Sequence, residues 1–310
     1  MKYGFGVDLG GTTVKIACFS DNGTLMDKWE IPTVTDDGGS RILPDIAASI
    51  DTYRQEKGLA DCMGIGIGVP GPVNSRGIVN CCINLGWGIL DIPSALQALT
   101  GLPVRAGNDA TVAALGECWM GGGQGSGNMV MVTLGTGVGG GIILGGKALH
   151  GVNGAGGEIG HMVLNREEAE RCGCGKKGCV EQYCSATGIV RIAKKYLSSN
   201  DIPSALRCIE NLTCKDIFDA GRAGDEAATA VLEQFYGYLG EFLANVCCVV
   251  DPETIVLGGG VSKAGQMLLE GTRPYFDKYV FHGCKDTRLA LASLGNDAGV
   301  YGAFKMILDM

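Results

Sequence analysis

The stretch Val7-Asp8-Leu9-Gly10-Gly11-Thr12-Thr13 places two glycines and two threonines between short apolar runs. Residues 3–9 and 13–20 are predicted to be strands, and Asp21-Asn22-Gly23 turns the chain into a third strand that ends near Pro32. A strand, a Gly-Gly turn and a second strand can surround an anion with backbone N–H groups and hydroxyls. The stretch therefore predicts a phosphate-binding hairpin; a plain hairpin is the alternative for this turn taken alone.

A second copy of this pattern begins at Val132. The residues Val132-Thr-Leu-Gly135-Thr136-Gly137-Val138 align with Val7–Thr13, with a strand expected on either side of both turns. Two related lobes would explain the match, and a chance likeness of Gly-rich stretches is the alternative. A third turn, Gly258-Gly259-Gly260, follows an expected strand at 253–257, and Ser262 is expected to cap the next helix. Three such turns can surround one nucleotide.

Strands and helices alternate along the rest of the chain. Further strands are expected at 62–69 and 104–107, and helices at 39–57, 92–100, from Asp109, 187–198, 214–220, 225–250 and 298–308. This alternation predicts an α/β sheet architecture. The 310 residues suit two domains or one two-lobed fold.

The composition excludes several classes of function. The net charge of −8, without clustered Lys or Arg, argues against a nucleic-acid partner. Fourteen cysteines without a signal peptide indicate a reducing compartment, so we expect a cytoplasmic protein. The longest apolar stretch, near residues 243–250, is too short to cross a bilayer, so no membrane span is expected.

A metal site is indicated by Gly157-Glu158-Ile-Gly-His161 together with Cys172-Gly-Cys174, Cys179 and Glu181. One imidazole and three thiols match a closed Cys3His zinc site, which leaves no open position for a reacting water. We therefore expect a structural zinc ion that fixes the loop carrying Glu158, His161 and Glu181. A disulfide is the alternative, but Cys-x-Cys suits the bridge geometry poorly and would leave a third thiol over.

Phosphoryl transfer chemistry is indicated by carboxylates close to the turns. Asp8 could help to hold Mg²⁺ through water, and Lys15 could add positive charge beside a phosphate. Asn108-Asp109 stands between a strand and a helix, where the aspartate is either a helix N-cap or a general base for an acceptor hydroxyl. Asn84, Asn108, Glu158, His161 and Glu181 could bond the other hydroxyls of a polyol.

Six motifs taken together resemble the ROK family of sugar kinases across nearly the whole chain. They are Asp8-Leu-Gly-Gly-Thr-Thr13, Gly68-Val-Pro-Gly71-Pro72, Asn108-Asp109, Gly135-Thr-Gly-Val-Gly139, Gly157-Glu-Ile-Gly-His161 and Cys172-x-Cys174-x4-Cys179-x-Glu181. Within the family, Ile83-Asn-Leu-Gly-Trp87 and the first motif most resemble glucokinases of Gram-positive bacteria.

The resemblance implies a two-lobed actin/hexokinase-type (ribonuclease H-like) ATPase fold with the nucleotide in a cleft between the lobes. Residues 1–110 with 298–310 would form the smaller lobe, and 111–297 the larger lobe with the zinc loop. The implied activity is transfer of the γ-phosphoryl group of ATP to the 6-hydroxyl of glucose, with Asp109 as base. Gly71, Asn84, Asn108, Glu158, His161 and Glu181 would contact the sugar, and His161 would also bind zinc.

The nucleotide site would then comprise Asp8, Gly10, Gly11, Thr12, Thr13, Lys15, Gly135, Thr136, Gly137, Gly258, Gly259 and Gly260. A homodimer or homotetramer is implied. Kinases for another hexose (N-acetylmannosamine, mannose or fructose) and a sugar sensor without catalysis are the alternatives. Repressors of the family carry a helix-turn-helix ahead of the kinase-like part, and a nucleotide strand that begins at residue 3 leaves no room for it.

Overall fold

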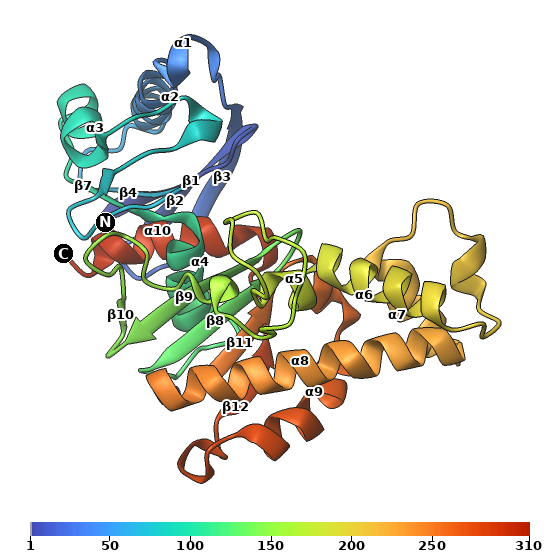
Figure 1. The fold of residues 1–310 in the computed structure, drawn as a ribbon. Helices are drawn as coiled ribbons and strands as arrows, with labels where there is room; N and C mark the ends of the chain where they lie inside the picture. Colours follow the sequence, from blue (N-terminus) through green and yellow to red (C-terminus); the bar gives the residue numbers. More distant parts are fainter. Residues whose placement is uncertain (1) are drawn as a thin grey trace. The chain divides into compact units, whose positions relative to one another are not determined.

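The computed structural model describes residues 2–310, which form two compact units (Figure 1). The first unit holds the described residues up to Gly125, together with Gly141–Gly157 and Leu294–Met310. The second unit holds Ser126–Gly140 and Glu158–Ser293. Helix α4 (Asp109–Met120) thus lies in the first unit, because it packs against the C-terminal helix α10 (Ala298–Leu308). The lobe boundary at residue 110, which the resemblance implies, falls inside this helix.

The first sheet has five strands in the order β3-β2-β1-β4-β7. Strands β1 (Tyr3–Leu9), β2 (Thr13–Ser20) and β3 (Leu25–Pro32) form the antiparallel meander expected from the opening sequence. Strands β4 (Cys62–Val69) and β7 (Val104–Asn108) join it in parallel. Because parallel strands end at the same edge, the register Val69↔Asn108 sets the end of β7 beside the end of β4.

Helices cover both faces of this sheet (Figure 1). Helices α2 (Ile42–Lys57) and α3 (Ile92–Thr100) bury Ile46, Ile50 and Leu96 with Phe5 and Val7 of β1 in the main core of the unit. On the opposite face, α10 places Val300, Phe304 and Ile307 against Ala17 and Phe19 of β2. All ten side chains are nearly or completely removed from water, which is the main source of stability for the unit.

Helix α10 reaches the sheet closely because glycines face it. A β-carbon at Gly6 would lie 2.0 Å from the carbonyl oxygen of Val300, and one at Gly66 would lie 1.7 Å from that of Ala303. Helix α4 meets α10 in the same way, since a β-carbon at Gly302 would lie 1.7 Å from the oxygen of Val112. A side chain at Gly6 or Gly66 would force α10 away from the sheet, and one at Gly302 would force it away from α4.

The second sheet has the order β10-β9-β8-β11-β12. Its strands are β8 (Met129–Leu134), β9 (Val138–Leu144), β10 (Lys147–Ala148), β11 (Thr254–Gly258) and β12 (Arg288–Leu291). Strand β11 runs parallel to both β8 and β12. If the five strands of each sheet are numbered from one to five along the chain, both sheets have the spatial order 3-2-1-4-5. This shared order agrees with the duplication suggested by the repeated turn.

The helices of the second unit pack around α8 (Glu226–Val250), which buries thirteen of its residues. They are α5 (Glu181–Cys184), α6 (Ala186–Ser199), α7 (Cys214–Arg222) and α9 (Gln266–Tyr279). Short elements complete the described chain: α1 (Asp36–Gly39), β5 (Ile78–Val79), β6 (Leu90–Asp91), and the 3-10 turns Ile83–Leu85, Ile159–His161, Ala205–Cys208, Gly260–Ala264, His282–Cys284 and Gly295–Asp297. None of the helices within residues 2–310 has the length and apolar character that a membrane span requires.

One expected helix cap is wrong. Ser262 does not cap α9, whose N-cap is Gly265 without a side-chain bond. Instead Ser262 lies inside the 3-10 turn Gly260–Ala264, and its hydroxyl donates to the carbonyl oxygen of Gly259 at 2.8 Å. The turn after β11 is thus closed by its own side chain before the helix begins.

Candidate active site

In the first unit, the turn Gly10-Gly11-Thr12 joins β1 to β2 and leaves room above its backbone. The amide of Gly10 donates to the carbonyl oxygen of Thr13 at 3.0 Å, and the hydroxyl of Thr33 donates to the carbonyl oxygen of Gly10 at 2.7 Å. Apart from its chain neighbours, no atom of the described residues lies within 4 Å of where a β-carbon of Gly11 would stand. Packing within the protein therefore does not demand glycine here, whereas a ligand that approaches the backbone would.

Asp8 lies at the end of β1, opposite Lys15 of β2. Burial raises the pKa of the Asp8 carboxyl; the charge of Lys15 opposes this shift, and the negative charge of Asp109 adds to it. Helix α10 begins directly over the carboxyl, since a β-carbon at Gly299 would lie 2.5 Å from its Cγ. Lys15 Nζ donates to the carbonyl oxygen of Asn296 at 3.0 Å, so its ammonium also holds the segment before α10.

The Asn108-Asp109 pair is fixed by four hydrogen bonds at the end of β7. Asn108, not Asp109, is the N-cap of α4, and its Oδ1 accepts from the amide of Thr111 at 3.1 Å. Its Nδ2 donates to the carbonyl oxygen of Gly71 at 3.0 Å and to Asp109 Oδ1 at 2.9 Å. The amide of Ala110 donates to the same Oδ1 at 2.8 Å. The helix-cap interpretation of Asp109 is therefore wrong.

Two further residues expected at the sugar, Gly71 and Asn84, also lie in this unit. Gly71 has a φ of +91°, and a β-carbon there would lie 2.9 Å from the carbonyl oxygen of Cys81. Asn84 is exposed in the 3-10 turn Ile83–Leu85. That turn is anchored by Trp87, which is buried and donates through Nε1 to the oxygen of Gly39 at 3.2 Å. The first unit thus presents the exposed carboxamide of Asn84 on a turn that Trp87 anchors.

In the second unit, the turn Gly135-Thr136-Gly137 is bonded to the segment that carries Glu181. Glu181 Oε2 accepts from the amide of Val138 at 3.1 Å, and a β-carbon at Gly137 would lie 2.2 Å from that oxygen. At the start of α6, the amide of Ala186 donates to the oxygen of Gly135 at 2.8 Å. Thr187 Oγ1 donates to the oxygen of Thr136 at 2.8 Å. Hydrogen bonds therefore connect the turn expected to bind the nucleotide with the segment that carries Glu181, which is expected to bind the sugar.

The four expected metal ligands come together in the second unit. The ligand atoms of His161, Cys172, Cys174 and Cys179 all lie within 4.8 Å of one another. The Sγ atoms of Cys174 and Cys179 are 3.6 Å apart, and Cys172 Sγ is 3.8 Å from His161 Nδ1. All three cysteines are free thiols, so the disulfide alternative finds no support. Tetrahedral Zn–S bonds of about 2.3 Å place two sulfurs roughly 3.8 Å apart, so the spacing fits zinc.

The imidazole of His161 has its two nitrogens in different surroundings. Nδ1 faces Cys172, whereas Nε2 lies 3.9 Å from Glu158 Oε2. The side chain of Glu158 is 59% exposed, so it remains accessible to a ligand. Glu181 Oε1 accepts from Cys172 Sγ at 3.4 Å, which places this carboxylate at the edge of the cluster. His161 can thus serve the thiol cluster with one nitrogen and a polar ligand with the other.

A cavity of about 180 Å³ opens beside the third glycine turn, also within the second unit. One side of the cavity is formed by Gly260, Val261 and Lys263. Helix α7 contributes Cys214, Phe218 and Arg222 to the other side. Arg222 Nη2 donates to the oxygen of Ala264 at 2.9 Å, which ties α7 to the turn. Sequence reasoning missed the α7 residues, because their polar and apolar spacing predicts only an amphipathic helix. Position 259 requires glycine, because its φ is +80° and a β-carbon there would lie 2.6 Å from the carbonyl oxygen of Leu134.

Comparison with known proteins places these features in context. A sequence model of the ROK family matches residues 4–310. A glucokinase of Halalkalibacterium halodurans is 45% identical over 96% of this chain and 92% of its own length. A glucokinase of Thermotoga maritima is 34% identical over 98% of this chain and 96% of its own length. The crystal structure of a ROK family glucokinase from Streptomyces griseus, in complex with glucose and AMPPNP, matches with a TM-score of 0.75, 31% identity and 98% coverage of both chains.

Proposed function

We propose that this chain, which belongs to the ROK family and has the two-domain sugar kinase fold, is an ATP-dependent glucokinase. It transfers the γ-phosphoryl group of ATP to the 6-hydroxyl of glucose, with Asp109 as the general base. The match to glucokinases over nearly the whole chain supports the activity. The fixed Asn108-Asp109 pair at the end of β7 is the observation that carries the assignment of the base.

The base acts while the phosphoryl group moves. The 6-oxygen of glucose forms a bond to the γ-phosphorus as the bond to the β-phosphate oxygen breaks and ADP leaves. The hydroxyl proton passes to the carboxylate of Asp109. Two donors on Oδ1, from Asn108 and Ala110, hold this carboxylate in one orientation, so it does not have to be ordered during the reaction. A positioned base of this kind contributes roughly 10²–10⁴-fold in rate.

The sugar is proposed to be held by planar acceptors and amides. Glu158 and Glu181 accept from hydroxyls, His161 uses Nε2, and Asn84 and Asn108 offer carboxamides, with Gly71 supplying backbone. The bond between Val138 and Glu181 supports this role, because it fixes one carboxylate oxygen while the other lies at the edge of the thiol cluster. Sites that bond a substrate hydroxyl in this way discriminate strongly against analogues that lack it.

The nucleotide is proposed to bind the glycine turns. Residues 10–13, 135–137 and 258–260 offer backbone N–H groups to phosphates, with Thr12, Thr13 and Thr136 adding hydroxyls and Lys15 adding charge. The cavity beside Gly260 and Phe218 suits an adenine ring, because it joins a phosphate turn to an aromatic side chain. Asp8 is the carboxylate that would hold Mg²⁺, and when bound this ion would neutralise charge on the transferring phosphates.

His161, Cys172, Cys174 and Cys179 are proposed to hold a structural zinc ion. The spacing of their donor atoms and the soft thiol set support zinc over a hard cation. When bound, the ion would cross-link the segment that begins at Glu158 to the one that ends at Glu181. It would leave the reaction itself to Asp109. We further propose, from the family likeness, that the protein works in the cytoplasm as a homodimer or homotetramer.

A coupled assay of ADP formation tests the proposal. Purified protein would be supplied with ATP, magnesium and, in turn, glucose, N-acetylmannosamine, mannose and fructose. We expect the highest kcat/KM with glucose. A higher value for another hexose would reassign the substrate, and calorimetric sugar binding without ADP formation would identify a sensor in place of a kinase.

A further inference from the structure

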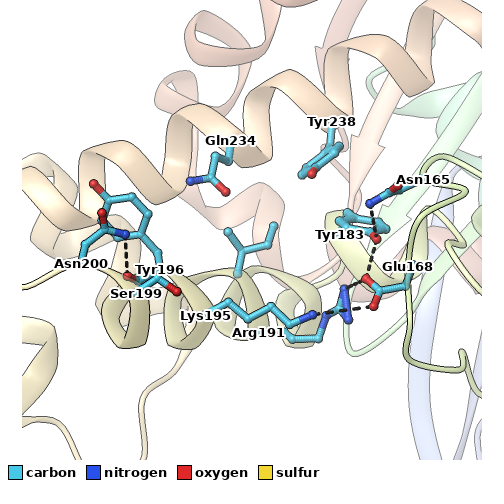
Figure 2. Close-up of a pocket in the computed structure, with 11 residues that line it drawn as sticks. Asn165, Glu168, Tyr183, Arg191, Lys195, Tyr196, Ser199, Asn200, Gln234 and Tyr238 are labelled. Atoms are coloured by element: carbon cyan, nitrogen blue, oxygen red, sulfur yellow. Dashed lines mark hydrogen bonds and ion pairs between the residues drawn. The ribbon is translucent and has the colours of Figure 1, made fainter.

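A second cavity, of about 340 Å³, lies within the second unit between α6 and α8 (Figure 2). It shares no residue with the groups assigned above to glucose, ATP or zinc. Arg191, Lys195 and Tyr196 come from α6, and Gln234 and Tyr238 face them from α8. Its volume is at the lower end of the range for small-molecule sites.

One end of the cavity is closed by an ion network with no excess charge. Glu168, whose side chain is only 5% exposed, is bonded to Arg191 Nη2 and accepts from Tyr183 Oη at 2.5 Å. Arg191 Nη1 contacts Glu170 at 3.2 Å, and Lys195 Nζ contacts the same carboxylate at 3.0 Å. Two cations therefore face two carboxylates. An anionic ligand would have to break these pairs and would meet two negative charges.

The remaining lining offers neutral polar groups. Within residues 2–310, the side-chain polar groups of Ser199, Gln234, Tyr196 and Tyr238 form no hydrogen bond to the protein. The ring of Tyr238 lies 4.6 Å from that of Tyr183, which leaves its edge and hydroxyl toward the cavity. Apolar contact is limited to Ile192 and the faces of the phenols. Phenols, a carboxamide and a hydroxyl suit a ligand with many hydroxyl groups and an apolar ring face.

We propose that this cavity is a second carbohydrate site, which binds a neutral saccharide of one or two rings. The saccharide hydroxyls bond Gln234, Ser199 and the phenol of Tyr238, and an apolar sugar face rests against Tyr196. Arg191 keeps its bonds to Glu168 and Glu170.

The site is connected to the zinc loop through its closed end. Glu168 stands between His161 and Cys172 in sequence, and Tyr183 follows Glu181 by two residues. Val163 and Cys179 pair as an isolated β-bridge, so the two strands of this loop are bonded to each other. A saccharide that fixes Tyr238 therefore also restrains Tyr183, whose ring lies 4.6 Å from that of Tyr238, and with it the segment that carries Glu181. This coupling, unlike the binding itself, rests on the proposed function, and it should lower the KM for glucose.

The binding test uses isothermal titration calorimetry with maltose as the probe, in saturating glucose and without ATP. We expect saturable binding that weakens about five- to tenfold in Tyr238→Ala and in Gln234→Leu, as for the loss of one or two good contacts. Lys194→Ala is the matched control, because Lys194 is exposed on α6 and does not line the cavity. Gln234 is also exposed, so its replacement should leave thermal unfolding unchanged.

Several outcomes would overturn the proposal. They are an absence of maltose binding, an equal maltose affinity in wild type and both cavity variants, or displacement of maltose by inorganic phosphate, which would mean that charge governs binding. The kinase assay separates this inference from the proposed function, since calorimetry reads binding whether or not the protein turns over. If maltose binds and the glucose KM falls about twofold or more in wild type but not in Gln234→Leu, the coupling is supported. An unchanged KM with intact binding would refute the coupling.

Discussion

The backbone amide of Val138 donates to Oε2 of Glu181 across 3.1 Å, and this bond joins the second glycine turn to a carboxylate proposed to hold the sugar. The turn packs tightly against this carboxylate, because a β-carbon at Gly137 would lie 2.2 Å from the same oxygen. Any change in the turn must therefore move the carboxylate.

Gly137→Ala should raise the KM for glucose by about tenfold, since the new methyl group displaces Glu181 and removes one hydrogen bond. Gly135→Ala is the control, because beyond its chain neighbours the nearest described atom to its β-carbon would be the carbonyl oxygen of Gly137, at 4.0 Å. Steady-state kinetics with glucose varied at saturating ATP makes the comparison. Equal glucose KM values in the two variants would disprove the link.

Asp109→Asn should lower kcat by roughly 10²–10⁴-fold, because the amide accepts no proton from the sugar hydroxyl. Glucose binding, measured by calorimetry, should stay within a fewfold of wild type. Asn108→Ala provides the contrast: it removes the N-cap of α4 and should cost about 1 kcal/mol of stability in urea unfolding. A D109N variant that retains most of its kcat would rule out the assigned base.

Cys174→Ser should abolish stoichiometric zinc in elemental analysis of the purified protein and lower the thermal midpoint, because the cluster loses one of its four ligands. Activity should fall with the loss of order around His161. Cys248→Ser is the matched control, since that thiol is also exposed and stands apart from the cluster. Equal zinc content in both variants would contradict the Cys3His assignment.

Glu168 should make the protein acid-sensitive. Burial opposes its ionisation, but the Tyr183 hydroxyl, the Glu170 amide, Arg191 and Lys195 outweigh burial and lower its pKa from 4.5 to about 2. A lowered pKa gives stability that is present above pH 4.5 and is lost as the pH falls toward 2. Glu168→Gln should therefore cost roughly 1–3 kcal/mol in urea unfolding at pH 7 and much less near pH 2.5. A difference independent of pH would refute this account.

Much of this architecture could be predicted because its signals are local. The glycine turns end strands, Asn108 stands at a strand-to-helix junction, and Cys172, Cys174 and Cys179 lie within one loop. Local patterns also bounded α8, whose N-cap Asp225 is bonded to the amide of Ala228. In each of these cases the chemistry of neighbouring residues decides the structure.

The features that escaped prediction depend on distant residues. Ser262 resembles a helix cap, but closing the turn onto Gly259 satisfies its hydroxyl first. Phe218 and Arg222 belong to an ordinary amphipathic pattern, and only the packing of α7 beside Gly260 gives them a cavity. The network of Glu168 with Arg191 joins a loop to a helix 23 residues later, which spacing alone does not indicate.

The packing of α10 has a consequence for the order of events during translation. Strand β2 leaves the ribosome early, yet Phe19 is not fully covered until Val300 and Phe304 have been synthesised. The nascent chain thus leaves part of this aromatic cluster exposed for most of its elongation, and exposed apolar surface of this kind favours aggregation. Synthesis of α10 is the step that lets this part of the first unit close.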